Sequence, residues 1–302
     1  PFMAKLQRGE KVIAVELDPP FDQNAQKLME GAFLLKQSNV DIITLADSPL
    51  ARARADSVLL AAKVSSMVDI PVMPHIACRD RNRISMHSTL LGAHINGIRN
   101  LMIITGDPVP SGERDNTKSV FDFNSIRFMD YVKEQSFCDE NQIYLMGQSR
   151  GGIMAAMEAG RRADEVAGLM LMYPGFYMID RLHEEYPDLS VIEGQDTITD
   201  NGKEFGTAFL TDVYDWDVAG TCSQFKGNVL LVHGIADTTV PYTASLDALN
   251  NYYADSSSEL VLVSGKQSVH AFDAFYEAGQ EIAWNAAINY MNEQVELNSQ
   301  AE

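Results

Sequence analysis

The stretch YLMGQSRGG, Tyr144 to Gly152, decides how the second half of this chain is interpreted. An apolar run leads to Ser149, and glycines stand two residues before it and two and three residues after it. The pattern G-x-S-x-G between a strand and a helix is typical of a tight turn that projects a serine hydroxyl. Apolar residues in NQIYLMG (141–147) predict the strand, and those in IMAAMEAGRRA (153–163) predict the helix. We therefore predict that Ser149 is a nucleophile.

The glycines and the residue after the serine have expected roles of their own. Gly147, Gly151 and Gly152 would let strand and helix approach closely, because a side chain at these positions would hold the two segments apart. The backbone N–H of Arg150 would lie at the positive end of the helix. There it could donate to the oxyanion that forms when a nucleophile attacks a carbonyl group.

A serine hydroxyl becomes a good nucleophile only when a histidine accepts its proton and a carboxylate orients that histidine. In proteins with this turn the acid and then the histidine follow the serine along the chain. VLLVHGIADTTVP (229–241) is a buried strand that leads to Asp237, and ELVLVSGKQSVHAF (259–272) is the next strand, leading to His270. We predict a Ser149–His270–Asp237 triad.

Other residues compete for these two roles. His233 precedes the predicted acid, which is the wrong order, so we interpret it as structural. Asp247 and Asp273 fall in helical patterns and are less favoured than Asp237. The approach to His270 through SGKQSVHAF is longer than the usual short turn.

Residues 134–295 resemble the second half of an α/β-hydrolase of the cinnamoyl or feruloyl esterase-like branch. The resemblance is carried by IYLMGQSRGG, VLLVHGIADTTVPY and SVHAF, and by the segments YPGFYMIDRLHEEYPDL (173–189) and FLTDVYDWDV (209–218). It implies hydrolysis of a small-molecule carboxylic ester without cofactor or metal. The insertion 173–217 would be a cap over the acyl pocket, and an acidic surface loop is the alternative. The family's first four strands, and the loop that gives the second oxyanion donor, have no counterpart before Ser149, so impaired activity is expected.

The first part of the chain has a different pattern, in which predicted strands and helices alternate. Short β-rich runs at 11–17, 41–46, 71–78 and 100–105 alternate with helical patterns at 25–37, 55–67 and 84–98. Four successive βα units can begin either a doubly wound sheet or a (β/α)8 barrel.

Residues 11–129 resemble the first half of the flavin-dependent methylenetetrahydrofolate reductases, in particular the form fused to a homocysteine methyltransferase. The matching segments are AVELDPP (14–20), ITLADSPLARARADS (43–57), PHIACRDRN (74–82), LLGAHINGIRN (90–100) and TGDP (105–108). The resemblance implies a (β/α)8-barrel fold that holds FAD. It also implies that Glu16 acts as an acid, that Asp107 lies near flavin and folate, and that His75 lines the site.

Taken together, the sequence predicts an α/β protein made of two partial folds. Four βα units of (β/α)8-barrel type (1–133) precede the C-terminal half of an α/β-hydrolase sheet (134–302), and the join falls within 125–141. Residues 1–133 carry 16 Lys and Arg against 15 Asp and Glu, a net of +1, so the remainder carries 7 against 27, a net of −20. The chain resembles a chimera. An ester hydrolase is our first hypothesis, and the alternatives are a reductase fragment with FAD and an inactive chimera.

Composition restricts the partners. The net charge of −19 disfavours nucleic acid, whose phosphates bind clustered Lys and Arg. No apolar run approaches the ~20 residues that span a membrane, and we expect a cytoplasmic protein. Cys78, Cys138 and Cys222 lack metal-ligand spacing and are expected to be free thiols. Unpaired edges of a half-barrel sheet favour association with another copy of the chain.

Overall fold

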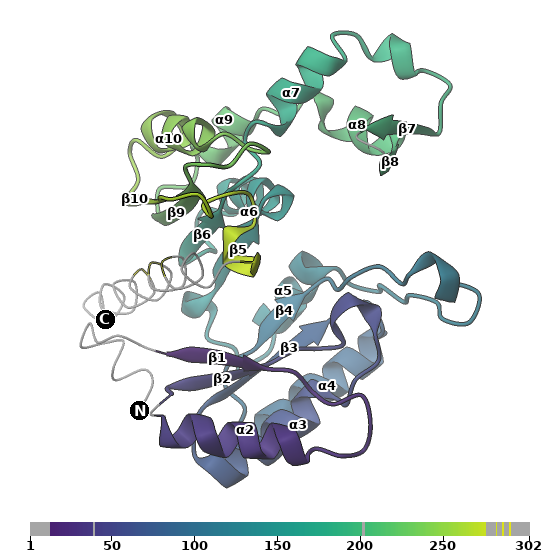
Figure 1. Cartoon of the computed structure of the whole chain (residues 1–302), viewed down its shortest axis with the longest axis vertical. Coiled ribbons are helices and arrows are strands. Elements are labelled where there is room, and N and C mark those ends of the chain that lie inside the picture. The colour runs from purple at the N-terminus through teal and green to yellow at the C-terminus, as the bar shows by residue number, and fades with distance from the viewer. Residues whose placement is uncertain are drawn as a thin grey trace. The chain divides into compact units, whose positions relative to one another are not determined.

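The computed structural model describes residues 13–38, 40–200 and 203–275, together with residues 282, 286 and 290. The chain divides into two compact units, unit 1 (Pro1–Asp139) and unit 2 (Glu140–Glu302). Each unit contains its own four-stranded parallel sheet, as Figure 1 shows. The predicted α/β fold class is therefore confirmed.

The sheet of unit 1 has the strand order β1-β2-β3-β4, which is also the order along the chain. The strands are β1 (Ala14–Leu17), β2 (Ile42–Leu45), β3 (Val72–Ala77) and β4 (Met102–Ile104). The helices are α2 (Gln26–Gln37), α3 (Ser57–Val68), α4 (Arg83–Ile95) and α5 (Ser125–Lys133), with 3₁₀ turns at Pro49–Ala51 and Ser111–Glu113. Right-handed crossovers between successive parallel strands place the connecting helices on one face, and α2, α3 and α4 lie together on one side of this sheet in Figure 1. This order is that of a (β/α) barrel segment, because a doubly wound sheet reverses direction.

Side-chain caps explain where several helices of unit 1 begin. Asp56 accepts a hydrogen bond from the backbone N–H of Leu59 at 2.9 Å, and Asn82 accepts one from that of Ser85 at 2.9 Å. Such caps satisfy N–H groups that have no partner within the helix. The core between helices and sheet includes Ile43, Leu45, Ile76, Met86, Leu90 and Phe128, all fully or almost fully buried.

The sheet of unit 2 has the order β10-β9-β6-β5. The strands are β5 (Tyr144–Gln148), β6 (Gly168–Met172), β9 (Asn228–Gly234) and β10 (Ser258–Val263). The helices beside them are α6 (Arg150–Arg161), α9 (Val218–Cys222), α10 (Tyr242–Asn251) and α11 (Phe272–Phe275), and a 3₁₀ turn spans Glu140–Gln142. The two inner strands are almost continuously buried, as is typical of parallel strands covered on both faces. In the described sheet, β5 is an edge strand.

A separate group of elements occupies the connection between β6 and α9. It contains α7 (Met178–Glu185), a 3₁₀ turn (Leu189–Ile192), the antiparallel hairpin β7 (Thr197–Asp200) and β8 (Lys203–Gly206), and α8 (Thr207–Tyr214). The imidazole of His183 on α7 lies against the ring of Tyr214 on α8, with ring centroids 4.4 Å apart. The insertion predicted at 173–217 is therefore built around a packed helix pair, and its role as a cap stays a prediction.

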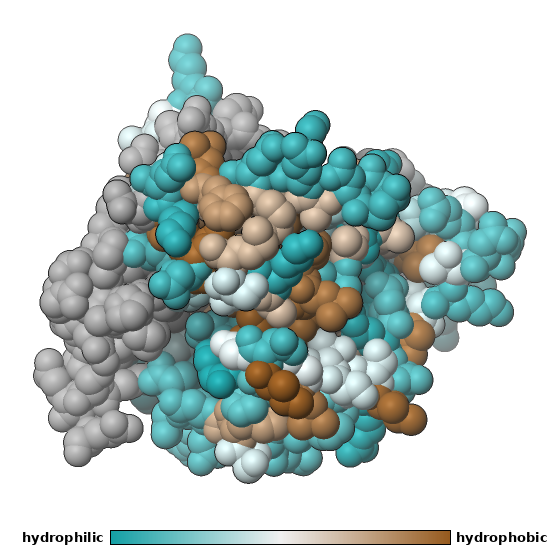
Figure 2. Space-filling model, turned by 90° about the horizontal axis from the view of Figure 1, so that it is seen from below, coloured by the Kyte–Doolittle hydropathy of each residue, from teal (hydrophilic) through white to brown (hydrophobic). Residues whose placement is uncertain are grey.

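Apolar side chains also reach the surface of unit 1. Figure 2 looks from below at the side on which α2, α3 and α4 lie in Figure 1, and several brown groups stand there among hydrophilic residues. The exposed apolar residues of these helices include Leu34, Leu59, Ile84 and Ile95. None of the described helices combines the length and the apolar character needed to cross a membrane.

Candidate active site

Ser149 stands at a strained turn between β5 and α6. Its backbone has φ 50° and ψ −120°, a conformation that L-residues rarely adopt. Hydrogen bonds on both sides of the residue hold it there: its N–H donates to the carbonyl oxygen of Met172 at 3.0 Å, and its own carbonyl oxygen accepts from the N–H of Gly175 at 2.8 Å. The segment after β6 thus fixes the turn that presents the hydroxyl.

Two of the three predicted elbow glycines are sterically required. A Cβ at Gly147 would lie 2.1 Å from the carbonyl oxygen of Gly151, and a Cβ at Gly152 would lie 2.8 Å from the Cα of Pro174. Both distances are too short for any contact, and the atoms in the way belong to the backbone. A Cβ at Gly151 would meet nothing within 4 Å. The close approach expected at Gly151 is therefore made at Gly152, because that residue is the one facing the segment after β6.

The three predicted triad residues lie together. Nε2 of His270 is 2.9 Å from Oγ of Ser149, and Nδ1 of His270 is 2.7 Å from Oδ2 of Asp237. An ionised carboxylate only accepts hydrogen bonds, so Nδ1 carries the proton of the neutral imidazole. Nε2 then has a free lone pair and accepts the proton of the serine hydroxyl. This is the arrangement that general-base activation of a serine requires.

Asp237 is buried and well supplied with donors. Its Oδ1 accepts from the backbone N–H of Thr239 at 2.8 Å and of Val240 at 2.9 Å. Burial alone would raise the pKa of this carboxyl, but hydrogen bonds from His233, His270 and Val240 outweigh it and hold the pKa below its usual range. Asp237 therefore stays ionised wherever the histidine could act as a base.

His233 contacts the carboxylate of Asp237 and the turn that carries it. It is fully buried, its Nδ1 lies 2.7 Å from Oγ of Ser245, and its Nε2 lies 3.0 Å from the carbonyl oxygen of Val240. Since a carbonyl oxygen only accepts, Nε2 carries the proton and Nδ1 accepts from the serine. Nε2 is also 3.4 Å from Oδ2 of Asp237. His233 thus fixes the turn that holds the acid.

The long approach to His270 is organised by one buried serine. The hydroxyl of Ser268 donates to the carbonyl oxygen of Gly265 at 2.7 Å, and its carbonyl oxygen accepts from the N–H of Ala236 at 3.1 Å. Gly265 has φ 106°, which glycine adopts without steric strain. The loop after β10 is in this way tied to the loop after β9, which carries the acid.

Arg150, whose N–H is predicted to donate to an oxyanion, directly follows Ser149. Arg150 is the first residue of the twelve-residue helix α6, so its backbone N–H lies at the positive end of the helix dipole. In α/β-hydrolases the second donor comes from a loop after another strand of the sheet. In the described sheet β5 pairs only with β6, so the side of β5 where such a strand would lie carries no other described strand of unit 2.

The residues predicted for the reductase alternative lie at the carboxyl ends of the strands of unit 1. Nε2 of His75 is buried, has no hydrogen-bond partner among the described residues, and lies 3.5 Å from Oε2 of Glu16. Burial raises the pKa of Glu16, with a further contribution from Asp18, and burial lowers the pKa of His75. Asp107 instead accepts a hydrogen bond from the N–H of Leu50 at 2.7 Å. The structure brings Glu16 and His75 together and ties Asp107 to the loop after β2.

Other polar groups at this end of unit 1 bind one another. The buried carboxylate of Asp47 accepts from the backbone N–H of Ala77 at 2.9 Å and from the guanidinium of Arg81. The guanidinium of Arg79 pairs with Asp80 and also donates to the carbonyl oxygen of Asp107 at 3.4 Å. These groups are already partnered within the protein.

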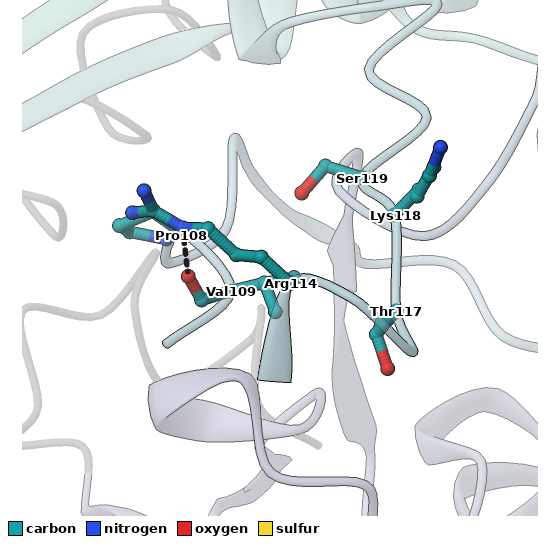
Figure 3. Close-up of a pocket in the computed structure, with 6 residues that line it drawn as sticks. All are labelled: Pro108, Val109, Arg114, Thr117, Lys118 and Ser119. Atoms are coloured by element: carbon teal, nitrogen blue, oxygen red, sulfur yellow. Dashed lines mark hydrogen bonds between the residues drawn. The ribbon is translucent and has the colours of Figure 1, made fainter. Parts of the chain in front are cut away.

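A cavity of about 340 Å³ lies in the loop after β4. Its walls are Pro108, Val109, Arg114, Thr117, Lys118 and Ser119. Figure 3 shows the side chain of Arg114 turned toward Pro108 and Val109, with Nε donating to the carbonyl oxygen of Val109 at 3.1 Å. The ammonium group of Lys118 points away from the guanidinium group of Arg114. The two cations do not converge, so the cavity is not arranged as an anion site.

No group of three His, Cys, Asp or Glu side chains within the described parts of the chain is placed to hold a metal ion. The three cysteines are free thiols, with Cys78 and Cys222 buried.

Sequence reasoning missed a second buried carboxylate near the triad. Asp273 accepts hydrogen bonds from the hydroxyl of Tyr173 at 2.7 Å and from Nε2 of Gln148 at 3.0 Å. In the sequence, Asp273 is only a less favoured alternative to Asp237 as the triad acid, three residues after His270. Its partners are 100 and 125 residues away along the chain, so no local pattern could have revealed them.

This geometry, on a parallel sheet with a strand-turn-helix nucleophile, defines unit 2 as part of an α/β serine hydrolase. Comparison with family models agrees: the model of the prolyl oligopeptidase family matches residues 112–293. The chain belongs to the prolyl oligopeptidase family. A second model, that of methylenetetrahydrofolate reductase, matches residues 2–147, so the two ranges overlap over 112–147. The predicted resemblances to a methylenetetrahydrofolate reductase and to an α/β-hydrolase are confirmed, and the chain combines segments similar to two families.

Three of the solved structures to which the chain shows similarity are the following. Est1E from Butyrivibrio proteoclasticus, with ferulic acid bound, is 18% identical; the match covers 74% of this chain and 88% of that one, with a TM-score of 0.49. The monoacylglycerol lipase of Paleococcus ferrophilus is 16% identical over 74% of this chain and 93% of its own, with a TM-score of 0.42. The acylaminoacyl peptidase of Pyrococcus horikoshii is 16% identical over 53% and 25%, with a TM-score of 0.37. Similarities at this level do not define a substrate. A comparison with curated protein sequences gives no match.

Proposed function

We propose that unit 2 hydrolyses carboxylic esters through an acyl-enzyme on Ser149. The observation that carries the proposal is the continuous chain of hydrogen bonds from Ser149 through His270 to the buried carboxylate of Asp237. A serine hydroxyl bonded only to water or backbone would have no base to accept its proton.

Each residue has a definite task in this reaction. Oγ of Ser149 would attack the ester carbonyl carbon while its proton moves to Nε2 of His270. Asp237 would hold the imidazole and stabilise its cationic form, and the N–H of Arg150 would donate to the oxyanion. Collapse of the tetrahedral intermediate would break the ester C–O bond, and the alcohol would leave with the proton from Nε2. Water activated by the same nitrogen would then release the acid and restore Ser149.

The proposed activity is weak for a hydrolase of this kind. Among the described residues we propose only the Arg150 N–H as an oxyanion donor, and loss of a donor reduces turnover by on the order of 10²-fold to 10³-fold. This favours esters with good leaving groups, because their tetrahedral intermediates form and collapse with less electrostatic assistance. Peptide amides have poor leaving groups and would be hydrolysed more slowly, although the family model that matches the chain is named for a peptidase.

A fluorophosphonate probe tests the proposal directly, because it phosphonylates only a serine whose hydroxyl is activated. We expect the wild-type chain to be labelled on Ser149, and Ser149→Ala to lose both the label and hydrolysis of short p-nitrophenyl esters. Ser257→Ala changes an exposed serine of the same unit and should leave both unchanged. A folded wild-type chain, verified by circular dichroism, that takes up no label would contradict the proposal and favour the inactive chimera.

The reductase alternative has less support. Its proposed residues Glu16 and His75 lie together, and the family model matches 2–147. However, unit 1 supplies four strand ends of a (β/α)8 site, and the polar groups of Asp47, Asp107 and Arg81 are engaged by the protein itself. On this basis we propose that the described residues of unit 1 do not hold FAD.

We therefore expect unit 1 to bind no stoichiometric FAD. Flavin fluorescence measured while the chain is added to FAD would remain unquenched, and protein purified after expression in flavin-rich medium would be colourless. Quenching that saturates at one flavin per chain and is lost in His75→Ala would favour the reductase alternative instead.

A further inference from the structure

Asp273 is a buried carboxylate that the proposed triad does not use. The residue is buried, with about 6% of its surface exposed. Oδ1 accepts from the hydroxyl of Tyr173 at 2.7 Å, and Oδ2 accepts from Nε2 of Gln148 at 3.0 Å. A buried carboxylate without such donors would strongly destabilise the fold, so the two donors and the acid are expected to act as one unit.

The members of this unit come from segments that carry the triad. Gln148 is the last residue of β5 and directly precedes Ser149. Asp273 lies in α11, three residues after His270. The carboxylate therefore links the strand that ends at the nucleophile to the loop that carries the base.

Tyr173 adds a direct contact with the base. Its ring and the imidazole of His270 meet edge to face, with centroids 4.8 Å apart and planes at 65°. The ring also packs against Phe272, with centroids 5.6 Å apart. Tyr173 is almost fully buried, and its backbone is held by a hydrogen bond from its N–H to the carbonyl oxygen of Val232 at 2.7 Å. The phenol is thus a fixed wall for one side of the imidazole.

The protonation states suit this role. Burial raises the pKa of Tyr173, and the hydrogen bond to Asp273 raises it further, so the phenol keeps its proton and donates to Asp273. Asp273 is not a spare triad acid, because both of its oxygens are engaged and Nδ1 of His270 already donates to Asp237.

We propose that Tyr173 and Asp273 are positioning residues for the acyl transfer proposed above: Asp273 anchors the phenol, and the phenol orients the imidazole of His270 toward Ser149. The inference rests on the proposed function. The expected consequence is that loss of either anchor lets the imidazole rotate away from the hydroxyl. A misplacement of about 1 Å in a catalytic group can reduce a rate by about 10²-fold.

The test compares two variants that keep shape with one that alters an unrelated buried tyrosine. Tyr173→Phe keeps the ring and removes its anchor, and Asp273→Asn keeps the volume and removes the charge. Tyr290→Phe is the matched control, because the buried hydroxyl of Tyr290 also makes hydrogen bonds, but to backbone groups of Leu169 and Asn228. For each chain we would measure the rate of fluorophosphonate labelling per folded molecule from pH 5 to 9, together with the thermal midpoint.

We expect Tyr173→Phe and Asp273→Asn each to slow labelling about tenfold and to shift the midpoint of its pH profile, with a double variant no slower than the slower single one. Tyr290→Phe should lower the thermal midpoint and leave the labelling rate and the pH midpoint unchanged. Wild-type rates and pH midpoints in both positioning variants would overturn the proposal, and so would an equal slowing in all three variants.

Failure of the proposed function would give a different result, because the wild-type chain itself would not be labelled. The positioning proposal can then be tested without labelling, by measuring the NMR chemical shifts of the His270 ring protons as the pH is changed. A shifted titration in Tyr173→Phe but not in Tyr290→Phe would support it, and identical titrations in all three chains would overturn it.

Discussion

Replacing Asp237 by asparagine is expected to slow acylation of Ser149 by on the order of 10⁴-fold. The amide would present a donor where Nδ1 of His270 now donates at 2.7 Å. The imidazole would then favour the tautomer with its proton on Nε2, which cannot accept the serine proton. The fold should persist, since the side chain keeps its volume and its amide oxygen can still accept from the N–H groups of Thr239 and Val240.

The measurement is the second-order rate of fluorophosphonate labelling, supported by p-nitrophenyl ester hydrolysis. Asp247→Asn is a suitable control, because it makes the same chemical change at an exposed aspartate of α10 whose carboxylate bonds to Asn251. Labelling of Asp237→Asn within tenfold of the wild-type rate would mean that the hydrogen-bonded chain does not activate Ser149.

Gly147→Ala is expected to destabilise unit 2 by about 3 kcal/mol and to abolish labelling of Ser149. The added methyl group would lie 2.1 Å from the carbonyl oxygen and 2.5 Å from the carbonyl carbon of Gly151. Both atoms belong to the first turn of α6, so no rotation of a side chain can relieve the overlap. Strand and helix would have to separate, and the backbone conformation of Ser149 depends on their approach.

Gly151→Ala provides the contrast, since its Cβ would have no neighbour within 4 Å and alanine favours a helix. It should label at close to the wild-type rate with an equal or higher thermal midpoint. Thermal unfolding and probe labelling of the two variants together check the prediction. Equal tolerance of both substitutions would show that β5 and α6 are not held at the observed distance.

The strands of both sheets and the three triad residues could be predicted because each depends on a short, local sequence pattern. Apolar runs that end in turn residues predicted the strands of both sheets, and the order of serine, acid and histidine led to Ser149, Asp237 and His270, which the structure brings together. Their catalytic roles stay predictions. The choice of Asp237 over Asp273 depended on position after a strand, and the structure places only Asp237 against Nδ1 of His270.

The rest could not be predicted because it depends on contacts between distant segments. The spacing of strands and helices in residues 11–105 is compatible with both a doubly wound and a barrel-type order; only the family resemblance favoured the barrel type, and the observed pairing of β1 to β4 follows that order. The requirement for glycine at 152 depends on Pro174, which reaches the elbow only after β5 and β6 have paired. The link from Asp273 to Gln148 spans 125 residues and leaves no periodic trace in the sequence.

In the sheet that the structure describes for unit 2, β5 lies at a border, and this position affects the order in which the unit loses structure. Border strands are bonded from one side, so they open locally at lower free energy than strands inside a sheet. Ser149 follows one border strand and His270 lies in the loop after the other, β10, whereas Asp237 follows the inner strand β9. Gentle heating would therefore separate Ser149 and His270 from each other and from Asp237 before the inner strands melt, and the unit would lose activity while most of its secondary structure persists.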